Sequence, residues 1–191
     1  MHTHPLRPAV SLLIAFTLLT GVGYPLAITG IARIAFPSQA AGSLLRVNGK
    51  VVGSRLIGQS FADPKYFWGR PSATAPQPYN PIASTGSNLG PLNPALLDQV
   101  RASAKSLRDA DPGNTQPIPV DLVSASASGL DPEISPAAAL FQVSRVARAR
   151  GLSVAQVEAL VRAHERGSLL GFIGEPRVNV LELNLALERA R

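Results

Sequence analysis

The sequence contains no cysteine among its 191 residues. This absence excludes a disulfide framework, a thiolate nucleophile and any cysteine-based metal site, and it leaves the redox compartment open. Histidine is scarce too, with only His2, His4 and His164. His2 and His4 precede a long apolar run, and His164 lies in the charged stretch 162–166, where we expect a solvated surface residue. The sequence therefore predicts no metal site.

The common catalytic signatures are absent as well. There is no GxSxG around a serine, no HExxH and no GxxxxGK[ST] phosphate-binding loop. The candidate carboxylates are Asp63, Asp121, Asp131 and Glu133, and the sequence does not show whether any two of them converge. Asp131-Pro132 is typical of a turn or a helix entry rather than of an acid catalyst. The residues alone predict no catalytic group and indicate a non-enzymatic, membrane-anchored partner protein.

Aromatic residues make up only 5% of the chain, and the net charge is +6. The cations are almost all arginines, which are scattered along the sequence. Nucleic-acid binding favours clustered cations interleaved with aromatics, so we expect no nucleic-acid partner. An anionic lipid surface or an acidic partner subunit fits this charge better.

A long uncharged apolar run occupies Pro8–Ala32. About 20 helical residues suffice to cross the core of a bilayer, so the run predicts one transmembrane helix over residues 8–35. Residues 1–7 then form an N-terminal tail, and residues 36–191 a single soluble domain. The alternative is a cleaved signal peptide with Ser38-Gln39-Ala40 as its cleavage site, but the run is about twice the usual length. The flanking cations give no clear orientation.

Two small-xxx-small spacings lie in this run, one from Thr17 to Gly21 and one from Gly23 to Ala27. Such spacings allow a neighbouring helix to approach closely. We therefore expect Thr17, Gly21, Gly23 and Ala27 to be helix-packing positions, the alternative being a helix that is surrounded by lipid.

The soluble part begins with a predicted β-hairpin, in which Ser43–Val47 and Val51–Ile57 flank Asn48-Gly49. A long irregular stretch follows over Gly69–Pro94, and Pro117–Val123 is predicted to be a strand. Helix-start signals occur at four places: Asn93-Pro94, Ser135-Pro136, Ser153 with Gln156, and Asn179 with Glu182. Leu181, Leu185 and Ala186 are expected to share one face of the last helix. The fold class predicted is α+β, a mixed domain with a helical C-terminal third.

Several long segments then point to one family. They are Phe61–Ala73, Tyr79–Pro81, Ser84–Pro91, Asp121–Pro136 and Gly174–Leu187, in this order after a helix that contains Tyr24-Pro25. Together they resemble the KdpC family, the small single-span subunit of the Kdp potassium-transporting P-type ATPase. The resemblance covers nearly the whole chain.

The resemblance implies an accessory role in a bacterial inner-membrane complex for high-affinity potassium uptake. Its partners would be a potassium-channel-like subunit, the P-type ATPase catalytic subunit and membrane lipid. The chain would stabilise assembly and act as a catalytic chaperone that raises the ATP affinity of the pump subunit, with a periplasmic soluble domain. ATP and potassium would be handled by the complex, and no cofactor is assigned to this chain. A freestanding anchored or secreted binding protein is the alternative.

The resemblance also suggests a nucleotide-linked stretch over residues 124–131, comprising Ser124, Ser126, Ser128, Gly129 and Asp131. Ala127 stands where the family leads us to expect glycine, which reduces the freedom of the backbone. Glu133 stands where histidine is common, and a carboxylate there repels phosphate. A structural role for this stretch is the preferred reading, with direct nucleotide binding left open.

Phe67, Arg70, Tyr79 and Asn88 are expected to be interface or scaffold positions. Arg70 would donate a forked pair of hydrogen bonds to a carboxylate on a partner, or else be solvated or paired inside the domain.

Overall fold

The computed structural model describes residues 5–190, which excludes His2 and His4 of the predicted tail. The chain divides into two compact units, residues 1–45 and 46–191, which are considered separately. The first contains the apolar helix, and the second is a mixed domain of helices and small sheets whose C-terminal third is helical. The predicted α+β class is confirmed.

The apolar helix is continuous over Leu6–Ala35, which is 30 residues, and an 18-residue window of it has a mean hydropathy of 1.8. None of its residues is buried within the structure. It consists of α1 (Leu6–Leu18), a π-helical turn η1 (Leu19–Gly23) and α2 (Tyr24–Ala35), and a short α3 (Pro37–Ala40) follows. Pro25 lacks an N–H group and its ring crowds the carbonyl one turn back, so the wider turn immediately before it has a physical cause. By length and composition the helix can cross a membrane.

The π-helical turn contains two of the four predicted helix-packing residues, Gly21 and Gly23. Gly21 lies one turn from Thr17, since a Cβ atom on Gly21 would stand 4.0 Å from the Thr17 methyl. Gly23 closes the π-helical turn, and Ala27 lies on α2. The role of these four residues in helix packing stays a prediction.

The hairpin is confirmed, with β1 (Leu44–Val47) and β2 (Lys50–Ser54) forming a two-stranded sheet. Asn48 and Gly49 have φ values of 50° and 79°, as a tight type I′ turn requires. The second strand ends at Ser54, three residues earlier than predicted.

All four predicted helix starts are found. Asn93 caps α4 (Pro94–Ala110), Ser135 caps α5 (Pro136–Arg150), and Ser153 with Gln156 forms a capping box on α6 (Val154–His164). Asn179 caps α7 (Val180–Arg189) by accepting a hydrogen bond from the Glu182 N–H. Each cap accepts a hydrogen bond from a backbone N–H that has no partner inside the helix.

The predicted strand over Pro117–Val123 is wrong. Pro117 and Pro119 carry no N–H group for a strand ladder, and the chain instead turns through a 3₁₀ helix, η3 (Val120–Leu122). The sheet of this domain is antiparallel, in the order β3-β5-β4, and its strands have only two or three residues: β3 (Glu133–Ile134), β4 (Glu165–Arg166) and β5 (Arg177–Asn179). Ile134 pairs with Val178, and Glu165 pairs with Val178 from the other side.

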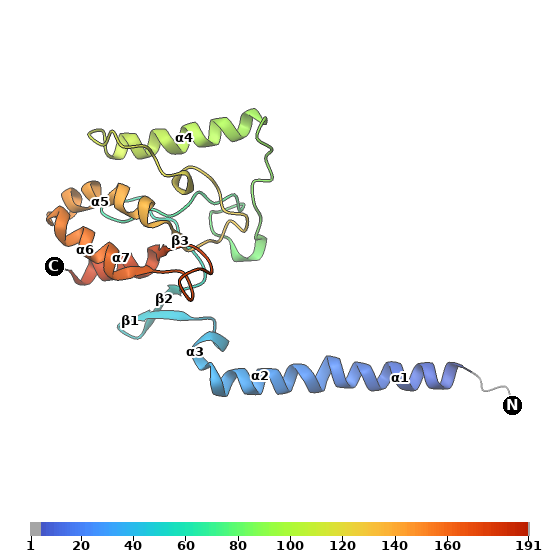
Figure 1. Cartoon of the computed structure of the whole chain (residues 1–191). Helices are drawn as coiled ribbons and strands as arrows, with labels where there is room; N and C mark the ends of the chain where they lie inside the picture. Colours follow the sequence, from blue (N-terminus) through green and yellow to red (C-terminus); the bar gives the residue numbers. More distant parts are fainter. Residues whose placement is uncertain (1–4, 191) are drawn as a thin grey trace. The chain divides into compact units, whose positions relative to one another are not determined.

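The core forms where α5, α6 and α7 pack together (Figure 1), and α4 contributes the buried side chain of Leu107 to it. Its fully buried members include Val146 of α5, Val157 of α6, and Leu183 and Leu187 of α7. The predicted face of α7 is only partly right: Leu181 is buried, whereas Leu185 and Ala186 are half-buried. The buried face of α7 carries Val180, Leu183 and Leu187. Asn184 is buried on the same face, and because it is polar, the hydrophobic pattern of the sequence did not indicate this face.

Candidate functional site

Two buried amide side chains hold the segment around Phe67. The Asn184 side chain accepts a hydrogen bond from the Phe67 N–H (2.8 Å) and donates one to the Phe67 carbonyl (2.9 Å). Gln142 does the same for Trp68, accepting from its N–H (2.8 Å) and donating to its carbonyl (3.1 Å). Phe67 is thereby held at both of its backbone polar groups, and it is fully buried.

Arg145 completes this clamp, which we define as Gln142, Arg145 and Asn184. Its guanidinium lies 4.2 Å from the Trp68 ring centroid and donates to the Gln142 side chain (2.6 Å) and the Tyr66 carbonyl (3.0 Å). Burial lowers the pKa of Arg145 to about 10, because the charged form loses its hydration. Sequence reasoning missed all three residues, because polar side chains on helices ordinarily face solvent.

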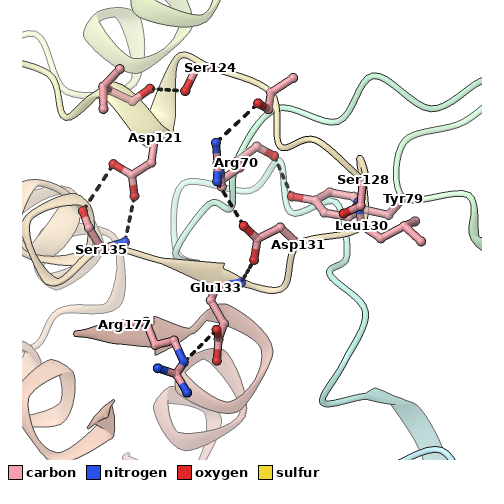
Figure 2. A network of polar contacts seen from close by, with 12 residues as sticks. Arg70, Tyr79, Asp121, Ser124, Ser128, Leu130, Asp131, Glu133, Ser135 and Arg177 are labelled. Carbon is pink, nitrogen blue, oxygen red and sulfur yellow. Dashed lines mark hydrogen bonds and ion pairs between the residues drawn. The ribbon is translucent and has the colours of Figure 1, made fainter. Parts of the chain in front are cut away.

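The clamp positions the segment that leads into Arg70. Arg70 Nη1 donates a hydrogen bond to the Asp131 carboxylate (3.1 Å), and Arg70 Nη2 donates one to the Ala125 carbonyl (3.3 Å), as Figure 2 shows. The carboxylate that Arg70 binds here belongs to the same chain, and a contact of Arg70 with a partner stays a prediction. Arg70 Nε is buried and has no partner within the described part of the chain.

Tyr79 supports Arg70 from the other side. Its hydroxyl donates a hydrogen bond to the Arg70 carbonyl (2.6 Å), and its backbone has a φ of 57°. Burial, together with the nearby Asp131 carboxylate, raises the pKa of Tyr79 to about 12. A Cβ atom on Gly58 would stand 2.3 Å from the Tyr79 ring, so the ring fits only against glycine there.

The stretch 124–131 is tied into the domain by its own polar groups. Ser124 Oγ donates to the Val120 carbonyl (2.7 Å), and Ser128 Oγ accepts from the Leu130 N–H (3.1 Å). The Ser128 carbonyl accepts from the Thr85 N–H (3.0 Å), and Ser126 is 5% exposed.

Gly129 fits where no side chain would. Its φ is 67°, and a Cβ atom would stand 2.7 Å from the Thr85 carbonyl oxygen. Its own carbonyl accepts a hydrogen bond from Ser72 Oγ (2.7 Å). The glycine therefore serves close packing between two loops of the domain, which is a different use from phosphate binding.

A cleft of about 530 Å³ borders this network, and its walls carry both signs of charge. Its carboxylates come from Asp121, Asp131, Glu133 and Glu175, and its arginines are Arg70 and Arg177. Both arginines are ion-paired inside the domain, Arg70 with Asp131 (3.1 Å) and Arg177 with Glu133 (3.0 Å). With four carboxylates and no unpaired arginine, these walls repel a phosphate group.

The carboxylates also have local tasks. Asp121 accepts from the Ser135 N–H (2.7 Å) and so reinforces the start of α5 (Figure 2). Asp131 Oδ1 accepts from the Glu133 N–H (3.0 Å), which makes the predicted turn at Asp131-Pro132. In residues 5–190, no group of three or more metal-binding side chains is found.

The remaining predicted residues lie outside this network. Asn88 is exposed in the middle loop, with a φ of 53° that asparagine tolerates. His164 is half-buried rather than fully solvated, and its Nδ1 lies 2.8 Å from the Leu160 carbonyl one turn back. The structure thus brings Arg70, Tyr79 and residues 124–131 together and leaves Asn88 apart.

Comparison with known proteins identifies close relatives. The family described as "K+-transporting ATPase, c chain" (KdpC) matches residues 6–189. A protein of Variovorax paradoxus named "Potassium-transporting ATPase KdpC subunit" is 65% identical over 183 residues, 96% of this chain and 95% of the relative. Proteins of the same name from Methylococcus capsulatus (60% over 185 residues, 97% of each chain) and Dechloromonas aromatica (63% over 183 residues, 96% of each) are similar.

Proposed function

The chain belongs to the KdpC family of potassium-transporting ATPase subunits, and on that premise we propose that it stabilises the complex and raises the ATP affinity of the catalytic subunit without binding ATP itself. Its partners would be the catalytic P-type subunit and a potassium-channel-like subunit. The soluble domain would lie in the periplasm. The chain would then be non-catalytic, and its effect on ATP would be allosteric.

The observation that carries this proposal is the internal use of residues 124–131. A phosphate site needs several N–H groups or cations directed at one point. Here the Gly129 N–H bonds to the Ser126 carbonyl, and the Leu130 N–H bonds to Ser128 Oγ. Arg70, the cation beside this stretch, is held by Asp131. Ser124, Ser126, Ser128, Gly129 and Asp131 thus support a scaffold better than a nucleotide site.

The first test compares the ATPase complex purified with and without this chain. We expect removal to abolish potassium-stimulated ATP hydrolysis, or to leave a residual activity with a raised KM for ATP. Full activity at an unchanged KM would overturn the proposal. Failure of this chain to co-purify with any ATPase subunit would support the freestanding binding protein instead.

A second test addresses direct contact with ATP, using the absence of native cysteine. Ala127→Cys places a thiol on an exposed residue of the loop and removes no hydrogen bond. We expect a membrane-impermeant maleimide to label this variant in intact cells, as a periplasmic domain requires. Labelling only after lysis would place the loop in the cytosol and would reopen direct contact with ATP.

A further inference from the structure

Residues 167–174 form an exposed, uncharged turn that we call the apolar tip. Its four large apolar residues are exposed: Leu169 65%, Leu170 76%, Phe172 76% and Ile173 48%. No charged residue occurs in its sequence, Gly-Ser-Leu-Leu-Gly-Phe-Ile-Gly. Exposing several large apolar side chains together is unfavourable in water and marks an interaction site.

The apolar tip is a defined structure. Leu169 and Ile173 exchange two backbone hydrogen bonds, 2.8 Å and 2.9 Å long. The Gly171 N–H bonds to the Ser168 carbonyl (3.1 Å). These donors are satisfied inside the turn, so the tip can enter a dry environment without leaving them unpaired.

The residue at the turn itself is unusual. Leu170 and Gly171 have φ values of 56° and 83°, close to the 50° and 79° of Asn48 and Gly49 in the β1–β2 hairpin. Asparagine is favoured at the first position of such a turn, whereas a bulky apolar residue there is an outlier. Folding alone would favour asparagine at 170, so the leucine points to a contact outside the domain.

The charges around the apolar tip distinguish between two kinds of surface. A segment that binds a membrane surface combines apolar residues with free cations that contact anionic headgroups. Here the flanking arginines are ion-paired within the domain, Arg166 with Glu182 (2.5 Å) and Arg177 with Glu133 (3.0 Å). The charge pattern is therefore complementary to an uncharged apolar surface of a protein.

We propose that the apolar tip inserts into an uncharged apolar depression on another subunit of the ATPase, with Leu170 at its centre. This inference rests on the proposed function, because it requires the chain to be part of that complex. Large apolar anchors at the centre of an interface commonly carry much of its binding energy.

The test places a photo-crosslinking benzoylphenylalanine at position 170 of the full chain in the assembled complex. The control carries it at Leu92, which is 94% exposed and lies in another loop. We expect irradiation to give an adduct with one other subunit from position 170, at least fivefold above the control. An adduct with lipid alone, or none while the subunits still co-purify, would overturn the inference and leave the proposed function standing. Absence of co-purification with the unmodified chain would overturn both.

Leu170→Asn separates folding from docking, because it restores the favoured turn residue and removes the anchor. We expect an unchanged or raised unfolding midpoint, together with at least a fivefold loss of the other subunits during purification. Leu92→Asn should change neither. Retention of the subunits at the unmodified level would overturn the role of the tip.

Discussion

The two halves of the soluble domain differ in the kind of contact that stabilises each of them. In α5–α7 the contacts are apolar, between fully buried side chains such as Val146, Val161 and Leu183. In the loop region, which we define as residues 58–93 and 111–134, hydrogen bonds from side chains to the backbone join the loops to one another, although Phe67, Leu122 and Ile134 also enter the apolar core. Ser72 Oγ alone donates to the Gly129 carbonyl (2.7 Å) and accepts from the Tyr79 N–H (2.9 Å). Apolar packing is spread over many atoms, whereas such a network depends on individual groups.

The clamp formed by Gln142, Arg145 and Asn184 joins these halves, and the largest effect is expected there. Gln142→Leu would leave the Trp68 N–H, the Trp68 carbonyl and part of the Arg145 guanidinium without partners. We expect a loss of about 4 kcal/mol in the free energy of unfolding. Urea unfolding of the full chain in detergent would measure it.

Gln99→Leu is the matched control, since Gln99 is an exposed residue of α4. Its substitution should change the free energy of unfolding by no more than about 0.5 kcal/mol. A loss below 1 kcal/mol for Gln142→Leu would show that the clamp is not what joins the halves.

Gly129→Ala sharpens the comparison inside the loop region. The new Cβ atom would meet the Thr85 carbonyl oxygen at 2.7 Å, at a φ of 67°. We expect a loss of about 3 kcal/mol in the free energy of unfolding, from backbone strain and from the displaced loop. Thermal unfolding followed by circular dichroism would measure it.

Gly151→Ala in the helical half provides the control, because Gly151 has the same φ of 67° and no neighbour within 4 Å of a Cβ atom. Gly151→Ala should lower the free energy of unfolding by about 1 kcal/mol, because it introduces backbone strain without a steric clash. Equal losses at the two glycines would contradict the close packing of the loops.

Tyr79→Phe should have the smallest effect. We expect it to lower the free energy of unfolding by about 1 kcal/mol at pH 8, because the hydrogen bond to the Arg70 carbonyl is lost. The pKa of Tyr79 is about 12 in the folded chain against an ordinary value of 10.0. The unfolded state therefore releases this proton first, so the contribution of Tyr79 is complete below pH 10 and is lost between pH 10 and 12.

Urea unfolding of both proteins at pH 8 and pH 11 would test this. The advantage of the unmodified chain over Tyr79→Phe should shrink or reverse at the higher pH. A difference that is the same at both pH values would contradict a buried tyrosine hydroxyl at this place.

The parts of the fold that were predicted correctly depend on neighbours in sequence. The caps Ser135 and Ser153 bond to N–H groups three residues ahead, and Asn48-Gly49 sets its own turn. The clamp depends on groups far apart along the chain, because Gln142 and Trp68 are 74 positions apart and Asn184 and Phe67 are 117 positions apart. No local pattern contains that information, so the clamp could not be foreseen.

The site shows the same division. The turn at Asp131-Pro132 was foreseen because Asp131 accepts from an N–H group two residues ahead. The pairing of Arg70 with Asp131 spans 61 residues, and only a choice among alternatives could be stated for it. The sheet escaped prediction for another reason: strands of two or three residues are too short for an alternating pattern to be recognised.

The length of the apolar helix has a consequence for its position in a bilayer. A helix of 30 residues is about 45 Å long, whereas the hydrocarbon core is about 30 Å thick and the whole bilayer about 40–45 Å. Arg7 lies in its first turn and Arg33 in its last, roughly 39 Å apart along the axis. If the helix crosses a bilayer upright, each guanidinium would lie among the lipid phosphates of a different leaflet, and the two arginines would resist sliding of the helix toward either side.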